Sequence, residues 1–88
     1  MVRVLLVYDI GEERLVKVHN ICRRYLYWVQ NSVFEGELTR GKLKRLIEDL
    51  EKVMDPERDS VVIYTFKGKN LMGRIHYGSA SLPDQFIF

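Results

Sequence analysis

A single acidic side chain, Asp9, directly follows an apolar run from Val4 to Tyr8. A carboxylate at the end of a buried strand is costly to desolvate unless a proton, a cation or a hydrogen-bond donor compensates its charge. Mg²⁺ prefers oxygen ligands and keeps much of its water, so one such carboxylate from each subunit of a dimer would suffice to hold one ion. An ion bound there could polarise a phosphoryl oxygen and activate bound water, as phosphodiester hydrolysis requires. Asp9 is therefore the candidate catalytic and metal-binding residue.

Asp9 also has a structural interpretation. In the turn from Asp9 to Glu12 its carboxylate could cap the following helix or accept backbone N–H groups. No obvious general base accompanies it. His19, expected on a helix surface, and His76, expected in an edge strand, have no mate at metal-ligand spacing, so we assign them no role.

Basic side chains are concentrated in the first half of the chain. Residues 1–45 hold nine Lys or Arg against five Asp or Glu, a net charge of +4, whereas residues 46–88 hold five against seven, a net charge of −2. Such clusters indicate either a phosphate-binding surface, whose affinity falls with salt, or two solvated helix surfaces. The candidate nucleic-acid-binding residues are Arg14, Lys17, Arg23, Arg24, Arg40 and Lys42, with Lys44 and Arg45 following them.

Hydrophobic periodicity predicts the elements that position these side chains. The first strand is apolar on both faces, and each helix carries one apolar stripe. We assign the order βαββαβ, the ferredoxin-like layout of the α+β class, with a four-stranded antiparallel sheet and two helices on one face. The expected strands cover residues 2–10, 29–38, 60–66 and 74–77, and the expected helices cover 12–25 and the stretch between Thr39 and Met54.

The 88 residues are expected to form one ferredoxin-like domain over residues 1–80. The composition is 47% hydrophobic and 11% aromatic, more than so small a two-layer domain easily buries. The sheet face without helices, which carries Leu5 and Val7, needs a cover, and we expect a homodimer that packs two such faces together. The apolar tail, residues 81–88, is expected to pair with the sheet edge of the partner subunit.

Other classes of protein are disfavoured. Cys22 is the single cysteine, so an internal disulfide is excluded, and no Cys or His cluster has the spacing of a zinc site. No apolar stretch reaches membrane length, and the chain does not open with a signal-peptide pattern. We therefore expect a cytoplasmic protein without a membrane partner.

A series of short segments spans nearly the whole chain in order: Tyr8-Asp9-Ile10, Arg14-Leu15 with Lys17-Val18, Val29-Gln30-Asn31-Ser32-Val33-Phe34-Glu35-Gly36, Asp59-Ser60 with Ile63-Tyr64, and Phe86-Ile87-Phe88. Together these segments resemble the small CRISPR-associated Cas-two family. The segment from Val29 to Gly36 is the specific signature, whereas the first tripeptide alone would be weak.

The resemblance implies a dimer of ferredoxin-like subunits that binds duplex DNA and scaffolds the Cas-one integrase during spacer acquisition. For some members it also implies a magnesium-dependent endonuclease acting on single-stranded RNA or double-stranded DNA. Asp9 would then be the metal-site residue, with one Mg²⁺ per dimer between the two Asp9 side chains. The residues that would lie near this site are Tyr8, Arg14, Lys17, Ser32 and Phe34.

Three of these neighbours have simpler interpretations. Ser32 is expected to be a strand residue with local hydrogen bonds, because no His and Asp pairing marks it as a nucleophile. Phe34 is expected in the core or the dimer interface, and Tyr8 in the core.

The chain also departs from the common family pattern. Leu26 and Trp28 stand where many members have Gly and Arg, so bulky side chains replace a flexible turn and a phosphate-binding cation.

The alternative function is that of a toxin ribonuclease of the related VapD type.

Overall fold

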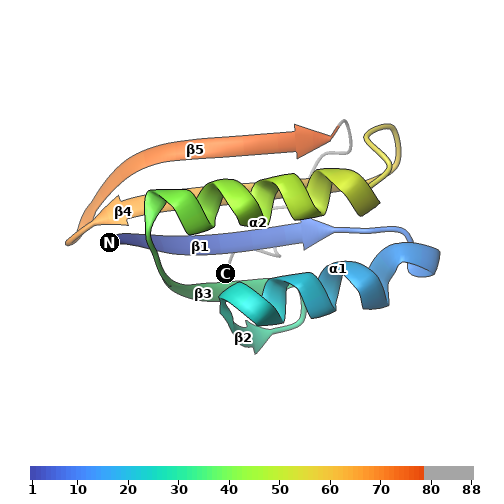
Figure 1. The fold of residues 1–88 in the computed structure, drawn as a ribbon, viewed down its shortest axis with the longest axis horizontal. Helices are drawn as coiled ribbons and strands as arrows, with labels where there is room; N and C mark the ends of the chain where they lie inside the picture. Colours follow the sequence, from blue (N-terminus) through green and yellow to red (C-terminus); the bar gives the residue numbers. More distant parts are fainter. Residues whose placement is uncertain (79–88) are drawn as a thin grey trace.

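The computed structural model describes residues 1–78; the predicted tail, 81–88, and the last two residues of the predicted domain lie outside this range. Five antiparallel strands form one sheet, and two helices pack on it (Figure 1). The elements within residues 1–78 are β1 (Val2–Asp9), α1 (Glu12–Tyr25), β2 (Tyr27–Gln30), β3 (Val33–Leu38), α2 (Arg40–Val53), β4 (Ser60–Lys67) and β5 (Asn70–Gly78).

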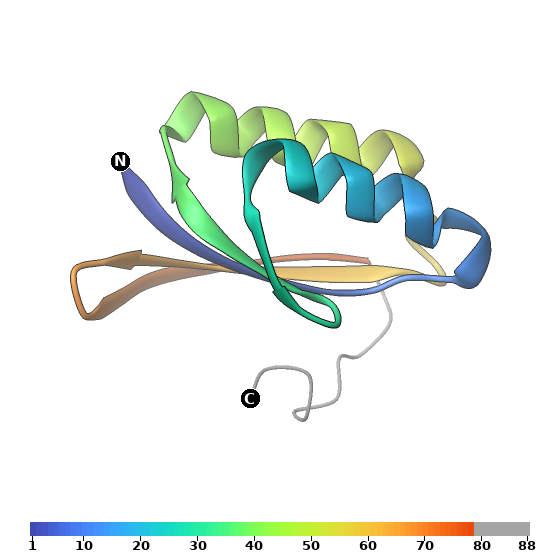
Figure 2. The same cartoon turned by 90° about the horizontal axis from the view of Figure 1, so that it is seen from below.

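The strands lie in the order β2-β3-β1-β4-β5, with β1 at the centre. Both helices lie on the same face of the sheet, and the opposite face carries no helix within residues 1–78 (Figure 2). This α+β architecture confirms the predicted ferredoxin-like fold class, although the sheet has five strands rather than four. Neither helix in this range is long and apolar enough to cross a membrane.

The single strand predicted for residues 29–38 is wrong, because the structure forms a hairpin there. β2 begins at Tyr27 and pairs with β3 through a turn at Asn31 and Ser32. Asn31 has a φ of 45°, which asparagine tolerates better than most residues, and its carbonyl accepts a 2.9 Å hydrogen bond from Trp28 Nε1. The segment lacks the Asn-Gly or Asp-Gly pair that usually signals a tight hairpin, so its pattern suggested one continuous strand.

The last predicted strand, 74–77, is longer in the structure. β5 runs from Asn70 to Gly78 and pairs along the full length of β4, with one register shift between Thr65 and Phe66. It forms the sheet edge opposite β2. The register shift interrupts the alternation of apolar and polar residues along β5. Only the cross-strand pairing with β4 therefore shows that the strand extends beyond the predicted bounds.

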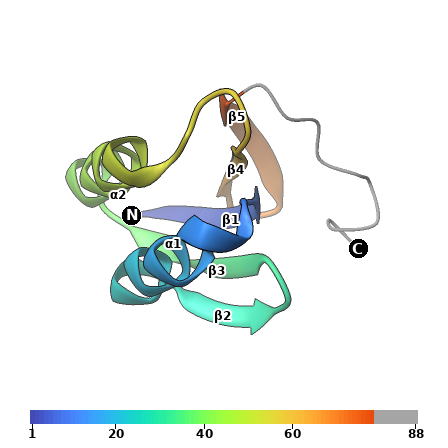
Figure 3. The same cartoon turned by 90° about the vertical axis from the view of Figure 1, so that its right-hand side faces the viewer.

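The core lies between the sheet and the helices. Val4, Leu6 and Tyr8 of β1 point into it, and they meet Val18, Ile21 and Cys22 of α1 and Leu46 and Leu50 of α2, all buried. The helices lie side by side over the sheet (Figure 3), and Tyr25 Oη donates a 2.7 Å hydrogen bond to Asp49 Oδ2 between them. Thr39 caps α2 by accepting a hydrogen bond from the Lys42 N–H, as its position predicted.

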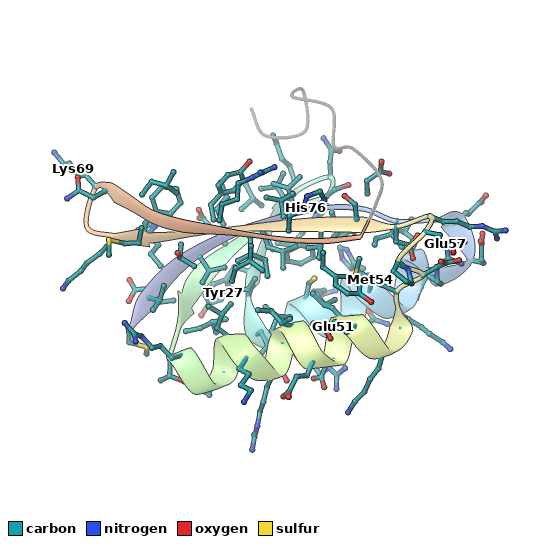
Figure 4. The ribbon with its side chains drawn as sticks, turned by 90° about the horizontal axis from the view of Figure 1, so that it is seen from above. Tyr27, Glu51, Met54, Glu57, Lys69 and His76 are labelled. Carbon is teal, nitrogen blue, oxygen red and sulfur yellow. The ribbon has the colours of Figure 1, made fainter. Side chains whose placement is uncertain are left out.

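The face of the sheet without helices has its own apolar row. Val7 pairs with Val33 on one side and Val62 on the other, and all three are buried but lie outside the core under the helices. Because side chains alternate along a strand, Asp9, two residues after Val7, faces the same way. His76, opposite Val62, is exposed on this side, whereas Met54 lies on the helix side (Figure 4). We call this the open face.

Candidate functional site

Asp9 ends β1 on the open face. It pairs directly with Ser60, the first residue of β4, and Ser60 pairs on its other side with Gly78 of β5. Tyr8 and Val61, the neighbours of this pair along each strand, point into the core under the helices. The side chains of Asp9 and Ser60 therefore project together from the same end of the open face.

Asp9 has no structural partner within residues 1–78. Its side chain is half-buried, and in this range it forms no hydrogen bond or ion pair. The capping alternative is wrong, because Gly11 is the N-cap residue of α1 and no side chain caps that helix. The Gly11 N–H instead donates a 2.8 Å hydrogen bond to Asp59 Oδ1. A different acid thus does the structural work that Asp9 could have done.

Asp59 is the centre of a buried polar cluster. It is fully buried before β4, and it accepts hydrogen bonds from Arg14 Nε, from Arg14 Nη2 at 2.8 Å, and from the N–H of Asp55 at 2.8 Å. The hydrogen bonds from Arg14 lower the pKa of Asp59 to about 2, and those from Gly11 and Asp55 act in the same direction. Asp59 raises the pKa of Arg14 in turn.

The ion pair with Asp59 gives Arg14 a structural role. Its side chain is 17% exposed and also contacts Glu13 Oε1 at 3.0 Å. A guanidinium held in a two-pronged pair with a buried carboxylate is not free to bind phosphate. The residues predicted from the sequence did not include Asp59 in the site; an acid just before a buried strand was the signal that could have drawn attention to it.

The other candidate basic residues lie on the helices, away from the open face. Lys17, Arg23, Arg24, Arg40 and Lys42 are all exposed. α1 runs back from the end of the sheet that holds Asp9 (Figure 1), and its last turn, with Arg23 and Arg24, ends at Tyr25, whose Oη reaches Asp49 of α2. Arg40 and Lys42, in the first turn of α2, follow the end of β3 that pairs with Val2, so they lie at the opposite end of the sheet from Asp9.

Tyr8 and Phe34 belong to an aromatic cluster beneath α1. Their ring centroids are 6.0 Å apart, and the ring of His19 packs edge-on against Phe34 at 5.0 Å and against Trp28 at 5.8 Å. Tyr8 Oη lies 3.1 Å from His19 Nδ1, and burial raises the pKa of Tyr8 to about 12. Tyr8 and Phe34 are thus core residues, and His19 is half-buried against them rather than a surface residue.

Ser32 lies in the turn between β2 and β3 rather than in a strand. Its carbonyl accepts a 3.1 Å hydrogen bond from the N–H of Tyr8, so it supports the backbone next to Asp9.

The two departures from the family pattern also have structural reasons. Leu26 is buried and packs over Gly36, where an added Cβ would lie 3.0 Å from Leu26 Cδ2, and Trp28 braces the hairpin turn.

A divalent cation would find an incomplete ligand set in one chain. Within residues 1–78 no three His, Cys, Asp or Glu side chains gather as a metal site. The hydroxyl of Ser60, beside Asp9, is buried and has no hydrogen-bond partner in this range, so it is out of reach of a hydrated ion. The half-buried Asp9 carboxylate, which has no hydrogen-bond or ion-pair partner within residues 1–78, suits an ion that keeps most of its water and is completed by a second subunit.

Comparisons with known proteins identify the family. The family model described as CRISPR associated protein Cas2 matches residues 1–72. A protein from Methanothermobacter thermautotrophicus, named CRISPR-associated endoribonuclease Cas2, is 46% identical over 98% of this chain and 94% of its own length. A protein of the same name from Thermotoga maritima is 40% identical over 97% of this chain and 98% of its own.

Solved structures agree. One described as a crystal structure of Cas2 covers 93% of this chain and 92% of its own, with 43% identity and a TM-score of 0.74. Streptococcus pyogenes Cas2 at pH 6.5 covers 77% of this chain and 88% of its own, with 35% identity and a TM-score of 0.67. This chain belongs to the Cas2 family of CRISPR-associated proteins.

Proposed function

We propose that this protein acts in CRISPR spacer acquisition as a homodimer that binds duplex DNA and scaffolds the Cas-one integrase. Family membership supports the CRISPR-associated function. DNA binding is supported by exposed cations on the helices: none of Lys17, Arg23, Arg24, Arg40 and Lys42 takes part in an ion pair with another residue of the described range. Cations displayed on rigid helices are suited to contact phosphates without reading sequence.

A second activity, magnesium-dependent phosphodiester cleavage, is supported by a different observation. Asp9 is a half-buried carboxylate that the fold does not use within residues 1–78, and it lies on the open face rather than with the helix cations. Relatives 40–46% identical to this chain are named endoribonucleases. We therefore take single-stranded RNA as the first substrate to test and duplex DNA as the second.

The Asp9 carboxylates of both subunits would hold one Mg²⁺. When bound, such an ion polarises a phosphoryl oxygen and lowers the pKa of its water ligands. The chain itself keeps the backbone around Asp9 in place: the Ser32 carbonyl accepts the N–H of Tyr8 on one side, and Asp59 accepts the N–H of Gly11 on the other. Asp9 is thus presented from a backbone that is anchored before and after it.

The homodimer is supported by the composition of the open face. Leu5 is half-buried there beside Val7, Val33 and Val62, which a single chain already buries, and no helix of the described range covers this face. A sheet face of this kind is stabilised when a second copy covers it. Asp9 lies at the end of this row, so the site would be completed by dimerisation.

Duplex binding is tested by gel shift across a salt series. We expect length-dependent binding that weakens as salt rises and that survives Asp9→Asn, because Asp9 lies away from the helix cations. Pull-down of the integrase by the wild-type dimer tests the scaffold. Binding that is independent of salt, or a protein that sizes as a monomer at micromolar concentration, would overturn this proposal.

Cleavage is tested separately with labelled single-stranded RNA and duplex DNA, with Mg²⁺ or with EDTA. We expect Mg²⁺-dependent cleavage that is lost in Asp9→Asn while the dimer stays intact by size-exclusion chromatography. Glu35→Gln is the matched control, since Glu35 is an exposed acid of β3 whose register partner, Leu5, lies on the open face. Equal cleavage by Asp9→Asn and wild type would contradict the role of Asp9.

The VapD-like toxin remains the alternative, and it differs in one measurable consequence. A toxin ribonuclease would arrest growth when it is expressed in cells without an integrase. A spacer-acquisition protein is expected to leave growth unchanged there, so arrest that depends on Asp9 would favour the toxin.

A further inference from the structure

The charged side chains of the open face are divided between its two sides. Glu35 of β3 lies on this face because it pairs with Leu5, and Glu37, two residues further on, faces the same way. Arg74 of β5 lies on it as well, because it pairs with Tyr64, which pairs in turn with Leu5. Both acids and Arg74 are exposed within residues 1–78. The face therefore carries acids on β3 and a cation on β5.

Glu35 and Arg74 are too far apart to pair within one subunit. They lie in one row across the sheet, with Leu5 and Tyr64, both half-buried, between them. Neighbouring strands are about 4.8 Å apart, so three strand spacings separate the two residues by about 14 Å. Within residues 1–78 Arg74 forms no ion pair, and Glu35 has only an exposed contact of 3.9 Å with Arg3, of a kind that contributes little.

This row is complementary to its own copy in only one of the two ways in which aligned sheets can pair. Two such sheets keep their strands within about 30° of each other, so the twofold axis lies nearly along the strands or nearly across them. An axis across the strands places β3 over β3 of the second copy, acid against acid. An axis along the strands, between β1 and β4, places β3 over β5 of the second copy, so that opposite charges meet.

We infer that the homodimer forms about an axis along the strands, with Glu35 of each subunit paired with Arg74 of the other. This inference rests on the proposed homodimer and specifies its register. Such an axis places each row over the same row of the second copy, so Leu5 lies over Tyr64 of the other subunit. Both Asp9 side chains then lie at the same end of the dimer, as the proposed shared Mg²⁺ requires. Like charges disfavour the other register.

The test is charge reversal, measured as the dissociation constant of the dimer by sedimentation velocity. Arg74→Glu alone and Glu35→Lys alone each introduce two like-charge contacts, and each should raise the dissociation constant at least about tenfold. The double variant has both pairs with their charges exchanged, and its dissociation constant should lie within about threefold of wild type. Glu35→Gln keeps an oxygen that accepts a hydrogen bond from Arg74, so it should remain dimeric.

A mixture of the two single variants distinguishes the ion pair from damage to the fold. A heterodimer of Arg74→Glu with Glu35→Lys has one native pair and one pair of exchanged charges, whereas each homodimer has two like-charge contacts. Native mass spectrometry should therefore detect mostly heterodimer. A substitution that merely disturbed the fold would weaken homodimer and heterodimer alike, and that result would overturn the inference.

Two control variants separate the register from net charge. Glu48→Lys makes the same change of net charge as Glu35→Lys, but on the exposed side of α2, so its dissociation constant should equal that of wild type. Glu37→Lys lies on the open face, but the β5 residue of its row is Leu71, so it should not restore dimerisation to Arg74→Glu. Equal restoration by Glu37→Lys and Glu35→Lys would overturn the inferred register.

Failure of the register is distinguishable from failure of the homodimer. A wild type that sizes as a monomer at micromolar concentration would overturn the homodimer and the inference with it. If the wild type is dimeric but Glu35→Lys does not restore dimerisation to Arg74→Glu, the homodimer is retained and only the inferred register is wrong. Single variants that dimerise as tightly as wild type would also overturn the register, because neither charge then faces the other subunit.

Discussion

Two acids at the same end of the sheet, Asp9 and Asp59, differ in burial and in hydrogen-bond partners. Asp59 is fully buried and accepts hydrogen bonds from Arg14, Gly11 and Asp55, whereas Asp9 is half-buried and unpartnered within residues 1–78. Asp59 links the segment before β4 to the start of α1 by hydrogen bonds, so its role is structural. The contrast teaches that position at a strand end does not by itself identify a functional acid, and that the absence of a structural partner is more informative.

The largest expected effect separates the two acids by stability. Asp59→Asn removes the buried partner of Arg14, which then keeps only the exposed Glu13, and should lower the free energy of unfolding by about 3 kcal/mol, as breaking a buried ion pair typically does. Asp9→Asn should change it by less than about 0.5 kcal/mol, because within residues 1–78 no hydrogen bond or ion pair of the Asp9 side chain is lost. Urea unfolding of both variants in EDTA measures the difference. Equal losses of unfolding free energy would contradict the distinction between the two acids.

Low pH should destabilise the protein by protonating Asp59. The pKa of Asp59 falls from its ordinary 3.8 to about 2 in the folded protein, so the carboxylate is fully ionised in both states near neutral pH. The stability it contributes is present above about pH 4 and is lost as pH falls towards 2. Unfolding measured from pH 6 to pH 2.5 should show this loss in wild type and Asp9→Asn, and a smaller loss in Asp59→Asn. An identical pH profile in Asp59→Asn would contradict the assignment.

Nucleic-acid binding sharpens the comparison between the helix layer and the open face. Replacing Arg23 and Arg24 together by Ala should weaken duplex DNA binding about tenfold and reduce the slope of log K against log salt by about 2, one for each phosphate contact. Arg14→Lys serves as a control in which charge is kept but the pair with Asp59 is weakened. We expect it to alter stability more than DNA affinity. A larger effect on DNA affinity than on stability would show that Arg14 contributes to DNA binding.

The smallest expected effect concerns the residue next to Asp9. Tyr8→Phe removes the hydrogen bond to His19 and should cost about 1 kcal/mol of unfolding free energy. Because Tyr8 points under the helices and Asp9 to the open face, Mg²⁺ affinity should not change. A large loss of Mg²⁺ affinity in this variant would mean that the two faces are coupled.

Much of the fold could be predicted from periodicity. The bounds of β1 and both helices agree with the prediction to within about one residue, since long amphipathic segments carry a strong signal. The hairpin at Asn31 and Ser32 could not be predicted in this way, because its turn relies on a positive φ at Asn31 and a hydrogen bond from Trp28 rather than on glycine. The same limit applies to the edge strand β5, whose length depends on pairing with β4.

The role of Asp9 in the candidate site stays a prediction. The apolar run before Asp9 marked it as the acid to examine, and family resemblance drew attention to Arg14, Lys17, Tyr8, Ser32 and Phe34. The structure separates these residues: Tyr8 and Phe34 lie in the core, Arg14 pairs with Asp59, and Lys17 lies exposed on α1. Sequence spacing places residues along an element but does not reveal which distant group satisfies each charge.

The amino-acid sequence by itself determined the α+β class, the central strand that ends in an acid, and the basic character of the helices, because these depend on local patterns of polarity. Tertiary structure alone decided that Asp59 is paired with Arg14 and that the Asp9 side chain has no partner within residues 1–78. The physical reason is that pairing and burial are set by contacts between segments far apart in the chain: Arg14 meets Asp59, and Asp9 meets Ser60, across about fifty residues.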